Sequence, residues 1–394
     1  MTRYRVLSLD GGGSWALIQV KALMRLHGAE ATGHAVLSQY DLVAANSGGS
    51  IVLGGLVENM TLADLLAFFL SEEARKSIFV EKWLHIGKIP TPKYKTEAKL
   101  EGLTAAFPLR GGLLLADAAA EIVNERTGRP VHLLITSFDY DRQRGRFFRS
   151  APASGPAWGD GDAAEVKVVE AMHASTNAPV LYFDKPAEFA SEQGMRYWDG
   201  GVSGCNNPVL AGVAEAVVLG NAPQSIVALA LGTGSVALPQ GPAGAEPAYL
   251  YAAVEEPGVL HDVKKLAGSI LDDPPDAASF LAHVLTGGAP DLPRPVDSRV
   301  VRMNPLVAPV RNADGKWALP EGMSVGDFEV LTNLGMDAVE QEDVLTIERL
   351  AALWLEDKAR NQPVRMSGAT QKAEIGHDCC GDARTAWRIL CASE

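Results

Sequence analysis

Short apolar runs alternate with amphipathic stretches along the first 235 residues of the chain, and glycine-rich turns follow several of the runs. The runs at 5–10 and 42–45 are rich in Val, Leu and Ala, which is typical of buried strands. Residues 14–28 carry apolar side chains at helical spacing and end at a glycine. Strands that alternate with helices in this way predict an α/β layered fold with a largely parallel sheet.

The alternation of predicted strands and helices continues further along the chain. Additional buried strands are predicted at 131–140, 144–150, 195–201 and 225–235, and two closing helices within 328–357. A sharp turn over 46–49 separates the second strand from a helix that begins at Ser50. Because parallel strands present their carboxyl ends at one edge of the sheet, we expect the glycine turns to lie together there and to form a functional site.

The amino-acid composition says more about the binding partners of the protein than about its fold. Of 394 residues, 47% are hydrophobic and 21% are charged, which is ordinary for a globular protein with a large core. The net charge of −13 argues against nucleic acid, because phosphate binding depends on clustered Lys and Arg. Four cysteines form no disulfide framework in a chain this long, and the HDCC run at 377–380 lacks zinc-ligand spacing, so no metal is expected. No signal peptide or membrane span is visible, which favours a cytoplasmic protein.

The first chemical candidate is Ser47, in the stretch Ala45-Asn46-Ser47-Gly48-Gly49 at the predicted turn between strand and helix. A serine at such a turn is a candidate nucleophile, and its strained backbone requires small residues on both sides. The usual pattern is Gly-x-Ser-x-Gly, so Ala45 departs from it while remaining small. A purely structural glycine-rich turn fits the same letters.

The glycines Gly11, Gly12 and Gly13 follow the first strand and admit two interpretations. Together with Ala16 they fit a relaxed dinucleotide-binding pattern, but no second strand ends in an acidic residue about 20 residues later, as that pattern requires. Glycine amides at the start of a helix also suit the oxyanion of a tetrahedral intermediate, because the bare backbone approaches closely and the helix dipole favours negative charge. The oxyanion interpretation fits better, and Ser14 extends the candidate set.

A serine hydroxyl needs a base, and Asp199 ends the predicted strand at 195–201 in another glycine-flanked turn. An aspartate that is partly shielded from water has a raised pKa and accepts a proton more readily. Of eight histidines, only His173 lies close to a further motif. We expect it to be a packing or surface residue and not the base of a Ser-His-Asp triad.

Five motifs occur in a fixed order along the chain: LSLDGGG at 7–13, ANSGG at 45–49, ASTNAPVLYF at 174–183, DGGVSGCNNP at 199–208 and LGTG at 231–234. Each is weak alone, but the ordered set resembles the patatin-like phospholipase family. The resemblance implies a three-layer α/β/α fold with a mostly parallel central sheet. It also implies one acyl hydrolase domain over 1–360, followed by a C-terminal extension at 361–394 of unknown role.

The resemblance further implies a serine acyl-ester hydrolase of the phospholipase A or lysophospholipase type. In it Ser47 is the nucleophile, Asp199 is the base, residues 11–13 form the oxyanion loop, and neither a metal nor a cofactor takes part. The family usually places Arg or Lys at the position of Trp15, so a cation near the oxyanion is missing and a bulky indole stands in its place. Together with Ala45, this departure is expected to narrow the acyl pocket or to alter the preferred leaving group. A weak or inactive lipid-binding module is the alternative, and a nucleotide-binding α/β protein is a more remote one.

A basic segment at 75–99 is the candidate contact with a membrane. Its cations are Arg75, Lys76, Lys82, Lys88, Lys93, Lys95 and Lys99, against Glu81 and Glu97, with Phe79, Trp83 and Tyr94 interleaved. Basic residues with aromatic neighbours suit peripheral binding to anionic lipid. A solvated helix face is the plainer interpretation. We therefore expect a cytoplasmic protein that reaches a membrane surface to find a phospholipid or another acyl ester.

Overall fold

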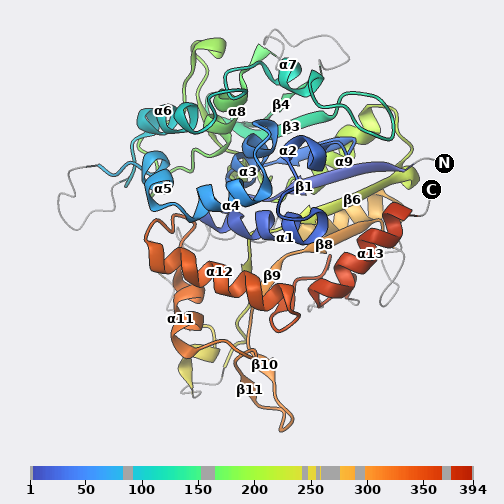
Figure 1. Ribbon diagram of the computed structural model, residues 1–394. Coiled ribbons are helices and arrows are strands. Elements are labelled where there is room, and N and C mark those ends of the chain that lie inside the picture. Colours follow the sequence, from blue (N-terminus) through green and yellow to red (C-terminus); the bar gives the residue numbers. More distant parts are fainter. Residues whose placement is uncertain are drawn as a thin grey trace.

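A computed structural model describes residues 3–82, 92–151, 165–241, 247–253, 258, 276–288, 298–365 and 374–392. Within them the main sheet has seven strands, six of which follow the order β4-β3-β2-β1-β6-β8 (Figure 1). These strands are β1 (Tyr4–Leu9), β2 (Leu42–Ala45), β3 (His132–Asp139), β4 (Arg144–Arg149), β6 (Ile226–Leu231) and β8 (Val300–Met303). The seventh, β5 (Tyr197–Asp199), pairs with β3. Each strand predicted above has a counterpart here.

The pairing explains why the glycine turns meet. β1 runs parallel to β2 and β6, β2 to β3, and β6 to β8, whereas β4 and β5 run antiparallel to β3. Leu9 is level with Ala45 on one side and with Leu231 on the other. The loops that leave these three strands therefore start at the same height, which confirms the predicted mostly parallel sheet and its shared carboxyl edge.

Helices cover both faces of the sheet, which is why its strands lack polar alternation. Leu7 and Leu9 belong to the larger core cluster, together with residues of α1 (Leu17–His27), α3 (Gly48–Val57) and α12 (Gln341–Leu355). Val6 points to the other face and packs with Val209 and Val213 of α9 (Val209–Val218). The predicted three-layer α/β/α arrangement is thereby confirmed (Figure 1).

The remaining elements surround these layers. The helices are α2 (Gly33–Leu37), α4 (Leu62–Leu70), α5 (Glu72–Ile78), α6 (Thr96–Ala106), α7 (Leu115–Ala120), α8 (Val168–Ser175), α11 (Val325–Asn333) and α13 (Cys380–Ala392). Short strands form a second sheet, β12 (Arg360–Asn361), β9 (Pro305–Val307) and β7 (Ser235–Val236), and a hairpin, β10 (Val310–Arg311) and β11 (Trp317–Ala318). None of the described helices is long and apolar enough to cross a membrane.

The C-terminal helix α13 packs on the same core as the rest of the chain. Trp387 is buried and stacks on Tyr40 at 6.1 Å between ring centres. The Arg5 guanidinium donates to the carbonyl of Cys391 at 2.7 Å, so the two ends of the chain lie side by side (Figure 1). None of the four cysteines forms a disulfide bond. The domain division at residue 360 stays a prediction, and residues 366–373 and 393–394 of the extension lie outside the described residues.

Candidate active site

Ser47 stands at the turn between β2 and α3 with φ 46° and ψ −123°. This backbone conformation is strained for a residue with a side chain, as predicted for a nucleophile at such a turn. The neighbours must be small, because a Cβ on Gly49 would overlap the carbonyl oxygen of Leu9. The Ser47 amide donates to Ser175 Oγ at 2.8 Å, so the end of α8 holds the turn from the other side.

The edge of β3 explains how Asp199 reaches Ser47. β2 ends opposite Ile135 of β3, and β5 occupies the next places along β3, with Asp199 opposite Ser137. β4 pairs with the other edge of β3. β5 therefore lies on the same edge of β3 as β2, just beyond the last residue of β2. The carboxylate of Asp199 is thereby brought beside the turn that carries Ser47.

The Asp199 carboxylate is buried and engaged in hydrogen bonds. Its Oδ1 accepts from Asn46 Nδ2 at 3.0 Å and from the Gly201 amide at 2.8 Å. The Ser47 side chain lies close enough to this carboxylate to lower its pKa. Asn46 is itself oriented by Thr136, whose hydroxyl donates to Asn46 Oδ1 at 2.7 Å. Asn46, which the sequence offered only as a residue of the turn, therefore orients the candidate base.

Burial raises the pKa of Asp199 above that of an ordinary aspartate. The Ser47 side chain and the hydrogen bonds from Gly201 and Asn46, together with the charge of Lys99, oppose this effect without cancelling it. A carboxylate with a raised pKa binds a proton more tightly than one in water. The environment therefore makes Asp199 a stronger base than an exposed aspartate would be.

Two of the four predicted oxyanion residues use their amides elsewhere. Gly11 donates to the carbonyl of Asn206 at 2.8 Å, and Ser14 donates to the carbonyl of Met336 at 3.0 Å. An amide that already donates to a carbonyl is not available to an oxyanion. The prediction that the amides of Gly11 and Ser14 bind the oxyanion is therefore wrong. The amides of Gly12 and Gly13 make no hydrogen bond to another described residue.

Gly48, predicted only as a small neighbour, joins this set. It is the first residue of α3, and its amide likewise has no hydrogen-bond partner within the described ranges. A Cβ on Gly48 would stand 2.5 Å from the carbonyl oxygen of Gly13, so the two loops touch. The partial positive charge at the start of α3 adds to the field of these amides. Gly13 and Gly48 line the same cavity as Ser47, so their amides are candidates to meet an oxyanion there.

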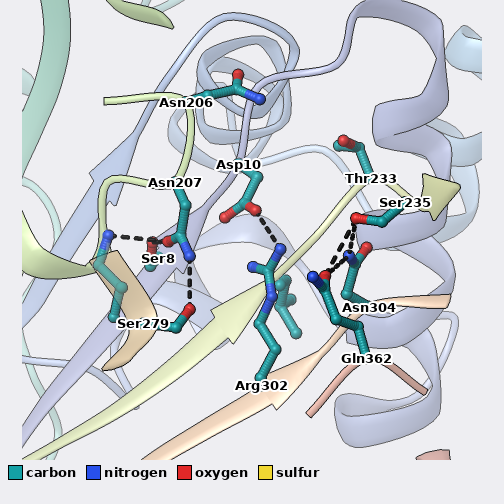
Figure 2. A network of polar contacts seen from close by, with 12 residues as sticks. Ser8, Asp10, Asn206, Asn207, Thr233, Ser235, Ser279, Arg302, Asn304 and Gln362 are labelled. Atoms are coloured by element: carbon teal, nitrogen blue, oxygen red, sulfur yellow. Dashed lines mark hydrogen bonds and ion pairs between the residues drawn. The ribbon is translucent and has the colours of Figure 1, made fainter. Parts of the chain in front are cut away.

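A buried polar network anchors the glycine loop (Figure 2). Asp10, the last residue before the glycines, pairs with Arg302 of β8 at 2.6 Å, and both side chains are 4% exposed. Burial raises the pKa of Asp10 to about 6, and the charge and hydrogen bond of Arg302 oppose this rise. The Thr233 hydroxyl donates to the Gly11 carbonyl at 2.6 Å. The sequence singled out neither Arg302 nor the contact of Thr233.

An apolar cavity lies beside Ser47. Its lining includes Ile51, Ile78, Phe79, Phe183, Met336 and one cation, Lys99. Apolar walls suit an acyl chain, but the free space is about 10 Å³, room for about one water molecule, so side chains must move to admit one. Trp15 is not part of this lining, because its indole N–H donates to the carbonyl of Gly335 at 3.0 Å. The indole therefore does not line this pocket, and an altered preference for the leaving group stays a prediction.

The basic segment at 75–99 differs from its prediction. Arg75 and Lys99 are buried, so the assignment of these two to a surface patch is wrong. Three further cations form ion pairs: Lys76 with Glu72, Lys82 with Asp184, and Lys93 with Asp337. Trp83 and Lys88 lie outside the described residues. The free positive charge of this surface is thus smaller than its composition suggests.

Histidine and metal chemistry find no support at the site. No histidine of the described part hydrogen-bonds to Ser47, and His173 is buried in α8. Within the same part, no cluster of three or more His, Cys, Asp and Glu side chains is arranged to hold a metal ion. The carbonyl of Met336 also occupies the first turn after the glycines, where a dinucleotide would place its phosphates.

Comparison with known proteins agrees with the motif order. No curated protein matches the chain in sequence. Among solved structures, that of VipD from Legionella pneumophila shares 11% identity and covers 89% of this chain and 67% of its own, with a TM-score of 0.35, which is too low to support an argument. A family model described as patatin-like phospholipase matches residues 7–213, more than half of the chain, including Ser47 and Asp199. The chain therefore belongs to the patatin-like phospholipase family.

Proposed function

We propose that the protein is a serine acyl-ester hydrolase of the phospholipase A or lysophospholipase type, with Ser47 as nucleophile and Asp199 as base. The observation that carries this proposal is the position of the buried Asp199 carboxylate beside Ser47. Asn46, the residue before Ser47, donates to Asp199 Oδ1 at 3.0 Å, and the Ser47 side chain lowers the pKa of Asp199. Ser47 lies at a strained turn that faces an apolar cavity. Membership of the family supports lipid hydrolysis in general, and the site supports the finer assignment.

The reaction would proceed in two halves. Asp199 accepts the hydroxyl proton while Ser47 Oγ attacks the ester carbonyl, and the amides of Gly12, Gly13 and Gly48 hold the oxyanion that forms. The intermediate then collapses, and the departing alcohol takes the proton from Asp199. Asp199 next deprotonates a water that attacks the acyl-enzyme, and the second collapse releases the fatty acid and restores the Ser47 hydroxyl.

The alternative is a lipid-binding module without turnover, favoured by the missing cation at the position of Trp15. A fluorophosphonate probe separates the two, because it reacts only with an activated serine. The experiment treats the protein with the probe, locates the adduct by mass spectrometry, and measures fatty acid release from phosphatidylcholine liposomes. An adduct on Ser47 with release of fatty acid supports the hydrolase, whereas vesicle binding without an adduct supports the module.

The pH dependence of the reaction follows from the environment of Asp199. The base must be ionised to accept a proton, so kcat/KM should rise with pH through the pKa of Asp199. Because burial raises that pKa, the acidic limb should lie above the ordinary range of an aspartate. Initial rates on a short-chain p-nitrophenyl ester, followed at the isosbestic wavelength of the product, measure the limb. A limb at the pKa of an exposed aspartate would contradict the proposed base.

We further propose that the protein is cytoplasmic and touches the membrane through Val180 and Leu181, which directly precede Tyr182 and Phe183 of the cavity lining. Val180 is 68% and Leu181 44% exposed. The carbonyl of Leu181 accepts from the amide of Lys93, so the apolar pair adjoins the basic segment. Apolar side chains next to lysines suit an anionic lipid surface.

Val180→Asp should weaken binding to anionic vesicles by about tenfold, the loss expected when one buried aliphatic side chain is replaced. Val180 has φ 69°, a conformation that aspartate tolerates better than valine, so the fold should survive. Val218→Asp is the matched control, because Val218 is equally exposed (69%) on α9. Vesicle co-sedimentation measures binding. Equal loss in both variants would count against this surface, and hydrolysis of a soluble ester should not change in either.

A further inference from the structure

Lys99 of α6 is completely buried in the wall of the cavity that Ser47 lines. Its Nζ donates to the carbonyl of His173 and to Asn177 Oδ1, both at 2.9 Å, and it lies 4.2 Å from the centre of the Phe183 ring. Two acceptors and an aromatic face satisfy an ammonium group. Lys99 is therefore held by the protein and is not presented to an anionic substrate.

The first acceptor ties Lys99 to the nucleophile. His173 lies in the last turn of α8, where carbonyl groups lack helical partners and a cation is favoured by the helix dipole. Two residues further on, Ser175 accepts the hydrogen bond of the Ser47 amide. Fixing the end of α8 therefore fixes one contact that shapes the strained turn of Ser47.

The second acceptor ties Lys99 to the base. Asn177 receives the Lys99 ammonium on its side chain, and its backbone carbonyl accepts from the Asp199 amide at 3.0 Å. The charge of Lys99 also attracts the Asp199 carboxylate and favours its ionised form. A single ammonium thus contacts both segments on which Ser47 and Asp199 depend.

The other charged side chains near Lys99 bind partners of their own. Asp184, the residue after Phe183, forms an ion pair with Lys82. The Arg75 guanidinium of α5 donates to two backbone carbonyls and to the side chain of Gln341. Burial and the charge of Lys99 both lower the pKa of His173, which keeps that ring neutral. Burial likewise lowers the pKa of Lys99, and Asp199 is the one charged group found to oppose this.

We propose that Lys99 is a positioning residue of the hydrolase, which sets the geometry of the Ser47–Asp199 pair and favours the ionised carboxylate. The inference rests on the proposed function and deepens it. Lys99 of α6 supplies a cation beside the pair although Trp15 stands where the family has Arg or Lys.

Lys99→Met, which keeps an unbranched chain of similar length, should lower kcat/KM on a short-chain ester by about 10- to 100-fold, the cost of slightly misplaced reacting groups. The acidic limb of its pH profile should move to higher pH, because the carboxylate loses a stabilising cation. Lys358→Met is the control, since Lys358 is exposed and pairs only with Glu356. A lower rate with an unmoved limb would show a merely structural role and overturn the inference.

A second readout works even if the protein hydrolyses nothing. Carbon-13 labelling of aspartate carboxyl groups, with the Asp199 signal identified from Asp199→Asn, gives the titration midpoint of Asp199 directly. The midpoint should be higher in Lys99→Met than in the unmodified protein, and equal midpoints would overturn the inference. If circular dichroism shows Lys99→Met to be unfolded, Lys99→Gln, which can still donate to Asn177, takes its place. An inactive protein with a shifted midpoint would refute the proposed function alone.

Discussion

Ser47→Ala is expected to abolish labelling by a fluorophosphonate and to lower kcat on a short-chain ester by about 10⁴- to 10⁶-fold, the range seen when a serine nucleophile is removed. The reason is that no other hydroxyl occupies the strained turn beside Asp199 in the described part of the chain. Alanine keeps the Cβ that the turn already accommodates, and the amide can still donate to Ser175. The variant should therefore fold normally, which thermal unfolding checks.

The matched control for this variant is Ser38→Ala. Ser38 caps the C-terminal end of α2 and does not line the cavity, and among the described residues its hydroxyl donates to the Ala35 carbonyl at 3.0 Å. Labelling and turnover should be unchanged in the control. If Ser47→Ala still carried the adduct or retained full turnover, the nucleophile would have to be sought elsewhere in the chain.

Asp199→Asn should lower kcat/KM by about 10²- to 10⁴-fold, the usual contribution of a general base. The amide is nearly the same shape as the carboxylate and can still accept from the Gly201 amide, but it cannot take the proton from Ser47. The acidic limb of the pH profile should vanish together with the rate. Steady-state kinetics over the accessible pH range measure both effects.

Asp139→Asn separates the loss of a base from the loss of a buried charge. Asp139 is also buried, on β3, but it pairs with Arg142 and accepts from the amides of residues 141 and 142. Its replacement should reduce the midpoint of thermal unfolding and leave kcat/KM nearly unchanged. If both variants lost activity equally, the role proposed for Asp199 would reduce to structural support.

Much of the fold could be predicted because its signals are local. The run at 42–45, the small residues around Ser47 and the apolar helix that follows specify strand, turn and helix within a few residues of one another. The register of Leu9 with Ala45 follows from parallel pairing, so the meeting of the glycine turns was also within reach. Asp199 could be named as a candidate base from its glycine-flanked turn at a strand end, but only the motif order linked it to Ser47.

The site's finer chemistry depends on partners that are distant in sequence. The amides of Gly11 and Ser14 are lost to Asn206 and Met336, and no pattern within 11–14 reveals that. Lys99 looked like one cation of a basic surface. The spacing of Lys99 gave a weak signal that it is buried. It lies on the same helical face as the other buried residues of α6, which are Thr96, Gly102 and Leu103.

The sequence by itself determined the layered α/β fold and the strained turn at Ser47, because backbone propensity and hydrophobic periodicity act over short distances. Tertiary structure alone decided which amides stay free, how Asp199 is desolvated and where the charge of Lys99 lies. Those properties depend on burial and on hydrogen bonds between segments, and such contacts exist only once β5, α6 and α8 have packed around the end of β2.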